Sequence, residues 1–554
     1  MGSAADLIVL NGRVLTMDAD NPTAAAVAIK DGSILAVGDR AEVAQLKGAG
    51  TKVVDAAGGS VVPGFVEAHM HLFCGAAEMV HLQLAGIRGF EALRDAVRAH
   101  AGARPDAAML MGQGVDYAVL GDERVTRHHL DAILPDRPFG MAAADHHTMW
   151  ANTRALEAAG ILAGRALGPG NEIVMDADGL ATGELREGEA FGPVLTLTGE
   201  DRARLGLATG GEPDPAPTAA ERAADRDILR RGLAWCARHG ITSIQNMDGN
   251  LYQLELLSEI EAGEGLACRV RVPFHFKNSM SLDMLDKAAM MAGRYRSEWL
   301  SSGTVKVFYD GVLDSWTAVM VEPYADRPGW VGEPLFSPER FRNLAVAIDR
   351  RGLQIAVHSI GDGAVRAVLD GYEAARQANG RRDSRHRIEH IEVITASDVP
   401  RFAELGVIAS MQPPHPPGAM DFPLEPTLSR IGRARWPLSY AWRTLKQAGA
   451  HVVFASDWPV SPIDPILGMK AAICRRPWAE GDPDQSFSLT EALAAYTVEG
   501  AYAEFMEHAK GRLKPGYMAD LVVLSKDIEA VDPNRLDEVR PVTTICGGRI
   551  TFHA

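Results

Sequence analysis

The chain has 554 residues, more than the roughly 250 to 300 at which a single hydrophobic core stops growing, so we expect one large domain with additions. Its 56 basic and 72 acidic side chains leave a net charge of −16, which argues against a general affinity for nucleic acid or anionic membranes. No run reaches the ~20 apolar residues of a membrane span, and no basic segment followed by an apolar one begins the chain. We therefore expect a soluble, cytoplasmic protein whose partners are small molecules.

The five cysteines favour the same compartment. They are scattered without CxxC spacing and are odd in number, which argues against a disulfide framework and a zinc ribbon. An apolar content of 47% and a charged content of 23% are those of globular proteins, so wholesale disorder is excluded. No pattern encodes the oligomeric state, and a homodimer is the default expectation because dimers are the commonest assemblies.

Both ends of the chain consist of short β-rich runs. In residues 1–60 these runs alternate with turn signals, and Asp31 with Gly32 between apolar flanks predicts a hairpin. Residues 506–554 have the same character. We predict that the two ends combine into one small split β-sandwich domain that neither end builds alone.

Between the ends, short apolar runs alternate with segments of helical composition, the pattern of an α/β fold with parallel strands. Eight such runs lie at residues 61–71, 241–248, 270–276, 304–311, 353–362, 386–392, 407–413 and 452–460. Eight runs predict a closed (β/α)8 TIM barrel over residues 61–505. The interval after the first run is far longer than the others, so about 74–220 is predicted to be an insertion, with a helix in FEALRDAVRAHA and a strand in RPFGMAAADHH.

A His-x-His pair ends the first of these runs. On an extended chain, His69 and His71 project to the same side, so both imidazoles can reach one metal ion. Two close histidines also arise by chance among the seventeen of this chain. For this pair alone, ordinary surface or core histidines are an equally good interpretation.

Three further side chains, His358, His390 and Asp457, end later runs. Barrel enzymes place their sites at the carboxyl ends of the strands, so these groups are expected to converge with the histidine pair. A hydrogen-bonded histidine or a capping aspartate explains each one alone. Their coincidence at several strand ends favours a metal site.

Lys306 lies within an apolar run, where an ammonium group is costly unless it is paired or chemically changed. One explanation is that the amine, made neutral by burial beside cations, takes up carbon dioxide. The resulting carbamate has two oxygens and bridges two metal ions. The alternative is an ion pair with Asp310 or another carboxylate.

Nine segments of the chain, in order, carry a resemblance to a known family. They are VVPGFVEAHMH, DHHTMWANTRAL, DADGLATGEL, VKVFYDG, AVHSIGDGAV, HRIEH, ASMQPPH, FASDWPV and GRLKPGYMADLVVL. The chain resembles the amidohydrolase superfamily, specifically amidohydrolase family 3, which includes N-substituted formamide deformylases. Two departures are Glu67, where the family usually has Asp, and His146, where it usually has Gly.

The resemblance implies a (β/α)8 barrel with a split β domain and a pair of divalent metal ions. The implied ligands are His69, His71, Lys306 as a carbamate, His358, His390 and Asp457. Zinc is the default metal, although imidazole also suits nickel, cobalt and iron. The implied reaction is hydrolysis of an amide-type C–N bond, in an N-substituted amide, formamide or carbamate, by metal-activated water.

In this interpretation Asp457 takes the proton from the water and passes it to the leaving amine. By resemblance, His147 is expected to stabilise the oxyanion as a second catalytic residue. His147, Trp150, Gln412 and His415 are expected to bind the substrate, a small amide-type molecule. For the first two, a packed core of the insertion is an equally good interpretation.

Two other functions compete with this one. A one-metal heterocycle deaminase typically has a Glu shortly after the histidine of the fifth strand, whereas here His358 is followed by Asp362 and no Glu at that spacing. A non-catalytic metal-binding protein on the same fold is indicated by a missing ligand, and none is missing from the sequence.

Overall fold

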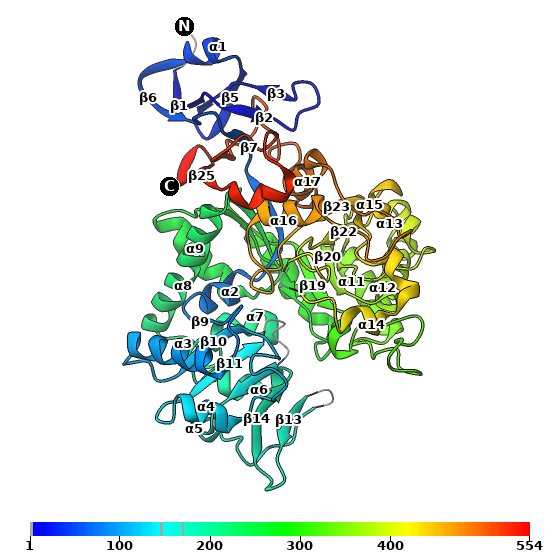
Figure 1. Ribbon diagram of the computed structural model, residues 1–554. Helices are drawn as coiled ribbons and strands as arrows, with labels where there is room; N and C mark the ends of the chain where they lie inside the picture. Colours follow the sequence, from blue (N-terminus) through cyan, green and yellow to red (C-terminus); the bar gives the residue numbers. More distant parts are fainter. Residues whose placement is uncertain (1–3, 144–147, 169–170, 421) are drawn as a thin grey trace. The chain divides into compact units, whose positions relative to one another are not determined.

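The structure is a computed structural model that describes residues 4–143, 148–168, 171–420 and 422–554 (Figure 1). It divides into two compact units: Met1–Leu72 together with Arg230–Ala554, and Phe73–Leu229. Both units combine helices with β-sheets. None of the helices in the described ranges is long and apolar enough to cross a membrane.

Two parallel sheets form the centre of the larger unit. The first has the order β18 (Leu300–Ser301), β16 (Arg269–Arg271), β15 (Ile241–Asn246) and β8 (Phe65–Met70). The second has the order β17 (Phe274–His275), β19 (Thr304–Phe308), β20 (Gln354–Ser359), β21 (Arg387–His390), β22 (Ile408–Met411) and β23 (His451–Phe454). These strands are buried along nearly their whole length, as expected for parallel strands covered on both faces.

Helices connect the consecutive parallel strands, which confirms the predicted α/β class. They are α9 (Leu251–Gly263), α10 (Leu285–Arg294), α11 (Pro338–Arg350), α12 (Asp362–Asn379), α13 (Val399–Leu405) and α15 (Trp442–Gln447). Local sequence explains α11: the Ser337 side chain caps it, Pro338 occupies its first turn, and Phe341 and Leu344 lie on its buried face.

The run predicted at 270–276 is two strands rather than one. Pro273 separates β16 from β17, and proline has no N–H to continue a ladder. Val272 bonds through its N–H to the carbonyl of Ser301, whereas Phe276 bonds to that of Lys306. The chain therefore passes from one parallel sheet to the other at this proline.

The run predicted at 61–71 is also divided. β7 (Ser60–Pro63) joins a sheet built from both chain ends, whereas β8 joins a parallel sheet. Gly64 lies between them, where a Cβ atom would approach the Thr242 side chain to 2.2 Å. Only glycine therefore fits this crossing without displacement.

Strands from both ends of the chain share one sheet. Its order is β26 (Arg549–His553), β25 (Pro541–Cys546), β24 (Leu521–Leu524), β7, β2 (Arg13–Leu15) and β3 (Thr23–Ala24). A second sheet has the order β5 (Ser33–Gly38), β4 (Ala26–Lys30), β1 (Ala5–Leu10) and β6 (Lys47–Asp55). The hairpin at Asp31 and Gly32 is confirmed, because Lys30 pairs with Ser33. The predicted domain boundaries at 60 and 506 stay a prediction, since both fall within one compact unit.

The smaller unit, Phe73–Leu229, contains a six-stranded sheet. Its order is β13 (Glu172–Met175), β14 (Ala181–Arg186), β12 (Thr148–Ala151), β11 (Phe139–Ala143), β10 (Leu110–Val115) and β9 (Leu82–Gln83). The helix predicted in FEALRDAVRAHA is α3 (Phe90–Ala103), and the strand predicted in RPFGMAAADHH is β11. Both predictions are confirmed.

Candidate metal centre

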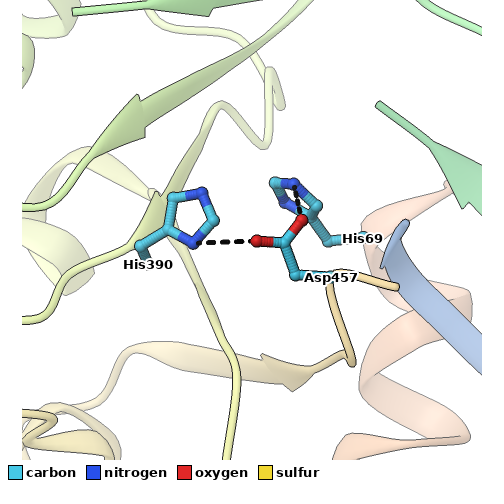
Figure 2. A group of neighbouring side chains, drawn as sticks. All are labelled: His69, His390 and Asp457. Atoms are coloured by element: carbon cyan, nitrogen blue, oxygen red, sulfur yellow. Dashed lines mark ion pairs between the residues drawn. The ribbon is translucent and has the colours of Figure 1, made fainter. Parts of the chain in front are cut away.

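Three of the predicted ligands meet in the larger unit. His69 belongs to β8, His390 ends β21 and Asp457 follows β23 (Figure 2). His69 Nε2 lies 3.3 Å from Asp457 Oδ1, and His390 Nδ1 lies 4.0 Å from Asp457 Oδ2. One donor atom of each residue lies within 4.8 Å of the other two, and all three side chains are buried. Ligands that share one zinc ion at ~2.1 Å are separated by similar distances.

His71 and His358 lie beside this group. His71 Nε2 is 3.1 Å from Asp457 Oδ1, so Oδ1 lies between the two histidines of the His-x-His pair. The rings of His358 and His390 have centroids 4.4 Å apart. His358 Nε2 lies 3.0 Å from the carbonyl oxygen of Gly311, to which it donates in the neutral ring, leaving Nδ1 with its lone pair. The structure thus brings the two predicted imidazoles to the same place.

Several polar atoms of this cluster are buried without a hydrogen-bond partner among the described residues. They are His69 Nε2, His71 Nδ1, Lys306 Nζ and Asp457 Oδ1. Leaving a buried polar group unsatisfied costs about 1–3 kcal/mol, so a ligand bound among these four atoms would stabilise the cluster. Imidazole nitrogen and carboxylate oxygen are the donors that zinc and related cations prefer. The residues therefore fit a divalent cation.

The protonation states of these groups suit cation binding. Burial lowers the pKa of His358 to about 3, with Lys306 adding to the effect, and lowers the pKa of His390 well below its usual value. Both rings are therefore neutral near pH 7 and keep a lone pair. Burial opposes ionisation of Asp457, but the imidazoles of His69 and His71 hold its pKa well below the usual range.

Lys306 is fully buried in β19, 4.8 Å from the centroid of the Phe308 ring. Burial lowers its pKa to about 8, so the neutral amine is more populated than in water. An ion pair with Asp310 is not among the contacts of the described residues. Asp310 instead accepts backbone N–H bonds from Val319, Ile360 and Gly361 at 2.9–3.0 Å.

Glu67 connects two of the elements that supply ligands. Its Oε1 accepts the backbone N–H of His69 at 3.2 Å and that of Ser456 at 2.9 Å. The N–H of Asp457 also donates to the carbonyl of His69 at 2.8 Å. Asp457 has a φ of 59°, a conformation that non-glycine residues rarely adopt and that these bonds maintain. Glu67 thus fixes the chain that carries Asp457 against β8.

Sequence reasoning missed a buried pair that supports His69. His69 Nδ1 lies 2.7 Å from Glu389 Oε2, and Arg387 donates to both oxygens of Glu389 at 2.8 and 3.0 Å. The contact of Nδ1 with this carboxylate fixes the orientation of the ring, so that Nε2 of His69 faces Asp457. Burial opposes ionisation of Glu389, but Arg387 and His69 hold its pKa well below the usual range. The available signal was two opposite charges inside the buried run HRIEH.

Arg387→Met is expected to lower the free energy of unfolding by ~3–5 kcal/mol, because it leaves the buried Glu389 carboxylate without its cation. Urea denaturation of the metal-free proteins measures this. The folded-state pKa of Glu389 is depressed, so the pair stabilises above the unfolded pKa and this contribution is lost as the pH falls. In the variant Glu389 protonates more readily, so the difference from wild type should shrink in acid. An Arg387→Met/Glu389→Gln double variant no more stable than the single one would contradict the explanation.

Two of the predicted substrate-binding residues lie at the centre. Gln412 Oε1 accepts from His390 Nδ1 at 2.9 Å, which leaves Nε2 of His390 with its lone pair. His415 Nε2 lies 3.9 Å from Asp457 Oδ2, and its ring is parallel to that of His390 with centroids 6.1 Å apart. These residues are positioned to orient a ligand or a substrate.

The other two are in the insertion. Trp150 belongs to β12 and is 3% exposed, with its ring edge-on to Tyr117 at 5.3 Å in the apolar core of the smaller unit. Its contact with substrate stays a prediction. His147 lies outside the described residues, as does His146.

Asp362, the residue weighed for a deaminase, is occupied elsewhere. It begins α12, and its Oδ1 accepts the backbone N–H of Val321 at 2.7 Å. Arg435 lies 3.8 Å from its other oxygen. The carboxylate thus fixes a loop to the start of a helix.

The mixed α/β fold of this chain, with its parallel sheets, is one that metal-dependent hydrolases also have. It matches the crystal structure of an uncharacterized metal-dependent hydrolase from Pyrococcus horikoshii OT3 with a TM-score of 0.74, at 24% sequence identity over 95% of this chain and 99% of that one. Residues 52–552 match the profile described as an amidohydrolase family, and the chain belongs to that family.

Two curated relatives span nearly the same length. Protein LONG AFTER FAR-RED 3 of Arabidopsis thaliana is 32% identical, over 95% of this chain and 88% of its own. The N-substituted formamide deformylase of Arthrobacter pascens is 26% identical, over 100% of this chain and 99% of its own. The resemblance to the amidohydrolases noted in the sequence is therefore confirmed.

Proposed function

We propose that this protein hydrolyses the C–N bond of an N-substituted amide, formamide or carbamate in a small molecule. The observation that carries the proposal is the buried group of His69, His390 and Asp457, whose donor atoms lie within 4.8 Å of one another. Membership of the amidohydrolase family supports hydrolysis, and the similarity to a formamide deformylase supports an amide-type bond.

The proposed ligands hold two divalent ions, with zinc as the default metal. They are His69, His71, His358, His390, Asp457 and Lys306 as a carbamate. Bound there, the cation supplies Lewis-acid chemistry, because it polarises a carbonyl oxygen and lowers the pKa of water to ~7. A carbamate would convert the unpaired Lys306 amine into an anion, which would offer oxygen ligands to the cations near the His358 imidazole.

Asp457 is the proposed proton carrier. It is buried as a carboxylate, with Oδ1 3.3 Å from His69 Nε2 and 3.1 Å from His71 Nε2. It accepts the proton of the attacking water and delivers it to the leaving nitrogen, so that one carboxylate serves both transfers. His147 is the proposed donor to the substrate carbonyl, and His415, 3.9 Å from the other oxygen of Asp457, is a proposed substrate-binding residue.

We also propose that the two parallel sheets form one (β/α)8 barrel. No strand ladder joins β8 to β23 within the described ranges. Two backbone hydrogen bonds support the closure: Asp457 N–H donates to His69 and His71 N–H donates to Trp458, both at 2.8 Å. The short gap at Pro273 is all that separates the sheets along the chain at β16 and β17.

The purified protein is expected to hold up to two divalent ions per chain and to lose activity when they are chelated. Six ligand groups exceed the needs of one four-coordinate ion. Elemental analysis measures the bound metal. Turnover of an N-substituted formamide, an aryl amide, a carbamate and an aminopurine is then measured for the chelated protein before and after zinc is restored. Full activity in metal-free protein would end the proposal. Turnover of the aminopurine alone would replace it with deamination.

A further inference from the structure

A lysine that the proposed function does not use lies at the carboxyl end of β17. His275 in β17 pairs in register with Lys306 in β19, so the two side chains share one face of the sheet. Phe308 follows Lys306 by two residues in β19 and points to that same face. Lys277 follows His275 by two residues, just beyond the end of β17, and its Nζ lies over the Phe308 ring. Phe308 in turn pairs in register with His358 of β20. Lys277, Phe308 and His358 thus form a row across neighbouring strand ends.

Contacts within this row connect Lys277 with the candidate metal centre. Lys277 Nζ lies 5.3 Å from the centroid of the Phe308 ring. The same ring stacks on His358, with centroids 4.6 Å apart, and has Lys306 Nζ at 4.8 Å. One partly exposed aromatic side chain therefore separates the Lys277 ammonium from a proposed metal ligand.

The charge of Lys277 is not balanced within the described residues. Its ammonium makes no ion pair or hydrogen bond with any carboxylate there, and its charge acts unfavourably on the amine of Lys306. Burial alone lowers the pKa of Lys277 to about 8, with no anion acting in the other direction. A partly desolvated ammonium without a partner is unfavourable, so an anion from outside this set of residues would stabilise it.

We propose that Lys277 binds a carboxylate-type anionic group of the substrate, with Phe308 as the apolar wall between that group and the scissile bond. This inference rests on the proposed function and narrows it. The substrate class is then an N-acyl compound that bears an apolar body and a negative charge near the amide. A carbamate on Lys306 would also present two anionic oxygens. The test therefore separates a carboxylate of the substrate from a carbamate on Lys306 as the partner of Lys277.

The test uses two compounds that differ only in one carboxylate: N-formylphenylalanine, as both enantiomers, and N-formyl-2-phenylethylamine. The measured quantity is the ratio of kcat/KM for the acid to that for the neutral compound. In zinc-loaded Lys277→Met, which keeps the length of the side chain, this ratio should fall at least ~10-fold, mostly through KM. Lys277→Arg should restore part of it. Lys470→Met removes an equal charge from an exposed pair with Asp537 and should leave the ratio unchanged.

Three results would overturn the inference or redirect it. An unchanged ratio in Lys277→Met, with both compounds hydrolysed, removes the substrate contact. Loss of bound zinc from that variant assigns the lysine to the Lys306 carbamate instead. If wild type hydrolyses neither compound, the proposed function fails for this class of substrate. The anion subsite is then tested by itself, by calorimetry of 3-phenylpropanoate binding. An equal Kd for wild type and Lys277→Met then overturns the anion subsite, whereas a Kd raised at least ~10-fold supports it.

Discussion

Lys306→Ala is expected to lose most of its bound metal and most of its activity. The amine is fully buried and has no hydrogen-bond partner among the described residues, so we propose for it a role at the metal centre rather than in an ion pair. As a carbamate it would supply two oxygens to the cations, and alanine supplies none. Metal content per chain and turnover of an N-substituted formamide measure the loss. Short carboxylic acids added to the variant should restore part of both.

A second substitution separates this chemistry from packing. Lys306→Met keeps most of the buried volume but removes the amine, so it should lose metal as Lys306→Ala does while unfolding at a higher temperature. If Lys306→Met retains metal and turnover, the lysine fills space and the carbamate has no role. If Lys306→Ala recovers metal when short carboxylic acids are added, and does not recover it without them, a bridging oxygen ligand is supported.

The positions of the proposed ligands were predictable because parallel strands bring their carboxyl ends together. His358, His390 and Asp457 each follow an apolar run, so their meeting depended only on the runs being neighbouring strands. His69 and His71 were predictable from their spacing of two on an extended chain. For these residues local sequence and sheet topology are sufficient.

The supporting groups depended on contacts that no local pattern contains. Glu389 bonds to His69, which lies 320 residues earlier in the chain, and Arg387 donates to Glu389, two residues away. In the sequence, both residues look like ordinary charged residues of a strand. Glu67 differs from the residue usual in the family, yet it bonds the backbone of both His69 and Ser456. Which atoms a buried carboxylate accepts from is decided by packing.

The limits of the strands were less predictable than their existence. The runs 61–71 and 270–276 were each interpreted as one strand, but Gly64 and Pro273 divide them between different sheets. Both residues are breakers, and their effect depended on tertiary surroundings: the side chain of Thr242 beside Gly64, and the missing N–H of Pro273 between two ladders. Hydrophobic pattern alone does not reveal a change of sheet.

Asp457→Asn is expected to lower turnover by at least ~10²-fold even when zinc is supplied in excess, the usual scale for losing a positioned acid and base. The substitution keeps the shape of the side chain but removes its negative charge and its ability to accept a proton. Oδ1 lies 3.3 Å from His69 Nε2 and 3.1 Å from His71 Nε2, so an amide there would place a neutral oxygen or an N–H between two ring nitrogens. Steady-state turnover of zinc-loaded protein measures the change.

The pH profile decides whether Asp457 carries the proton or only holds metal. A base must be ionised to act, and the pKa of Asp457 is held well below the usual range of aspartate, so activity that depends on Asp457 falls only at a pH below that range. This acidic limb should be absent or displaced in Asp457→Asn. Asp370→Asn, which alters an exposed carboxylate paired with Arg401, provides a control with the same chemical change and should keep both turnover and the limb. If Asp457→Asn binds zinc as wild type does, turns over at a near-normal rate and retains the acidic limb, then proton transfer belongs to another group. His415 is then the first candidate, because its Nε2 lies 3.9 Å from Asp457 Oδ2 and it is outside the proposed ligand set.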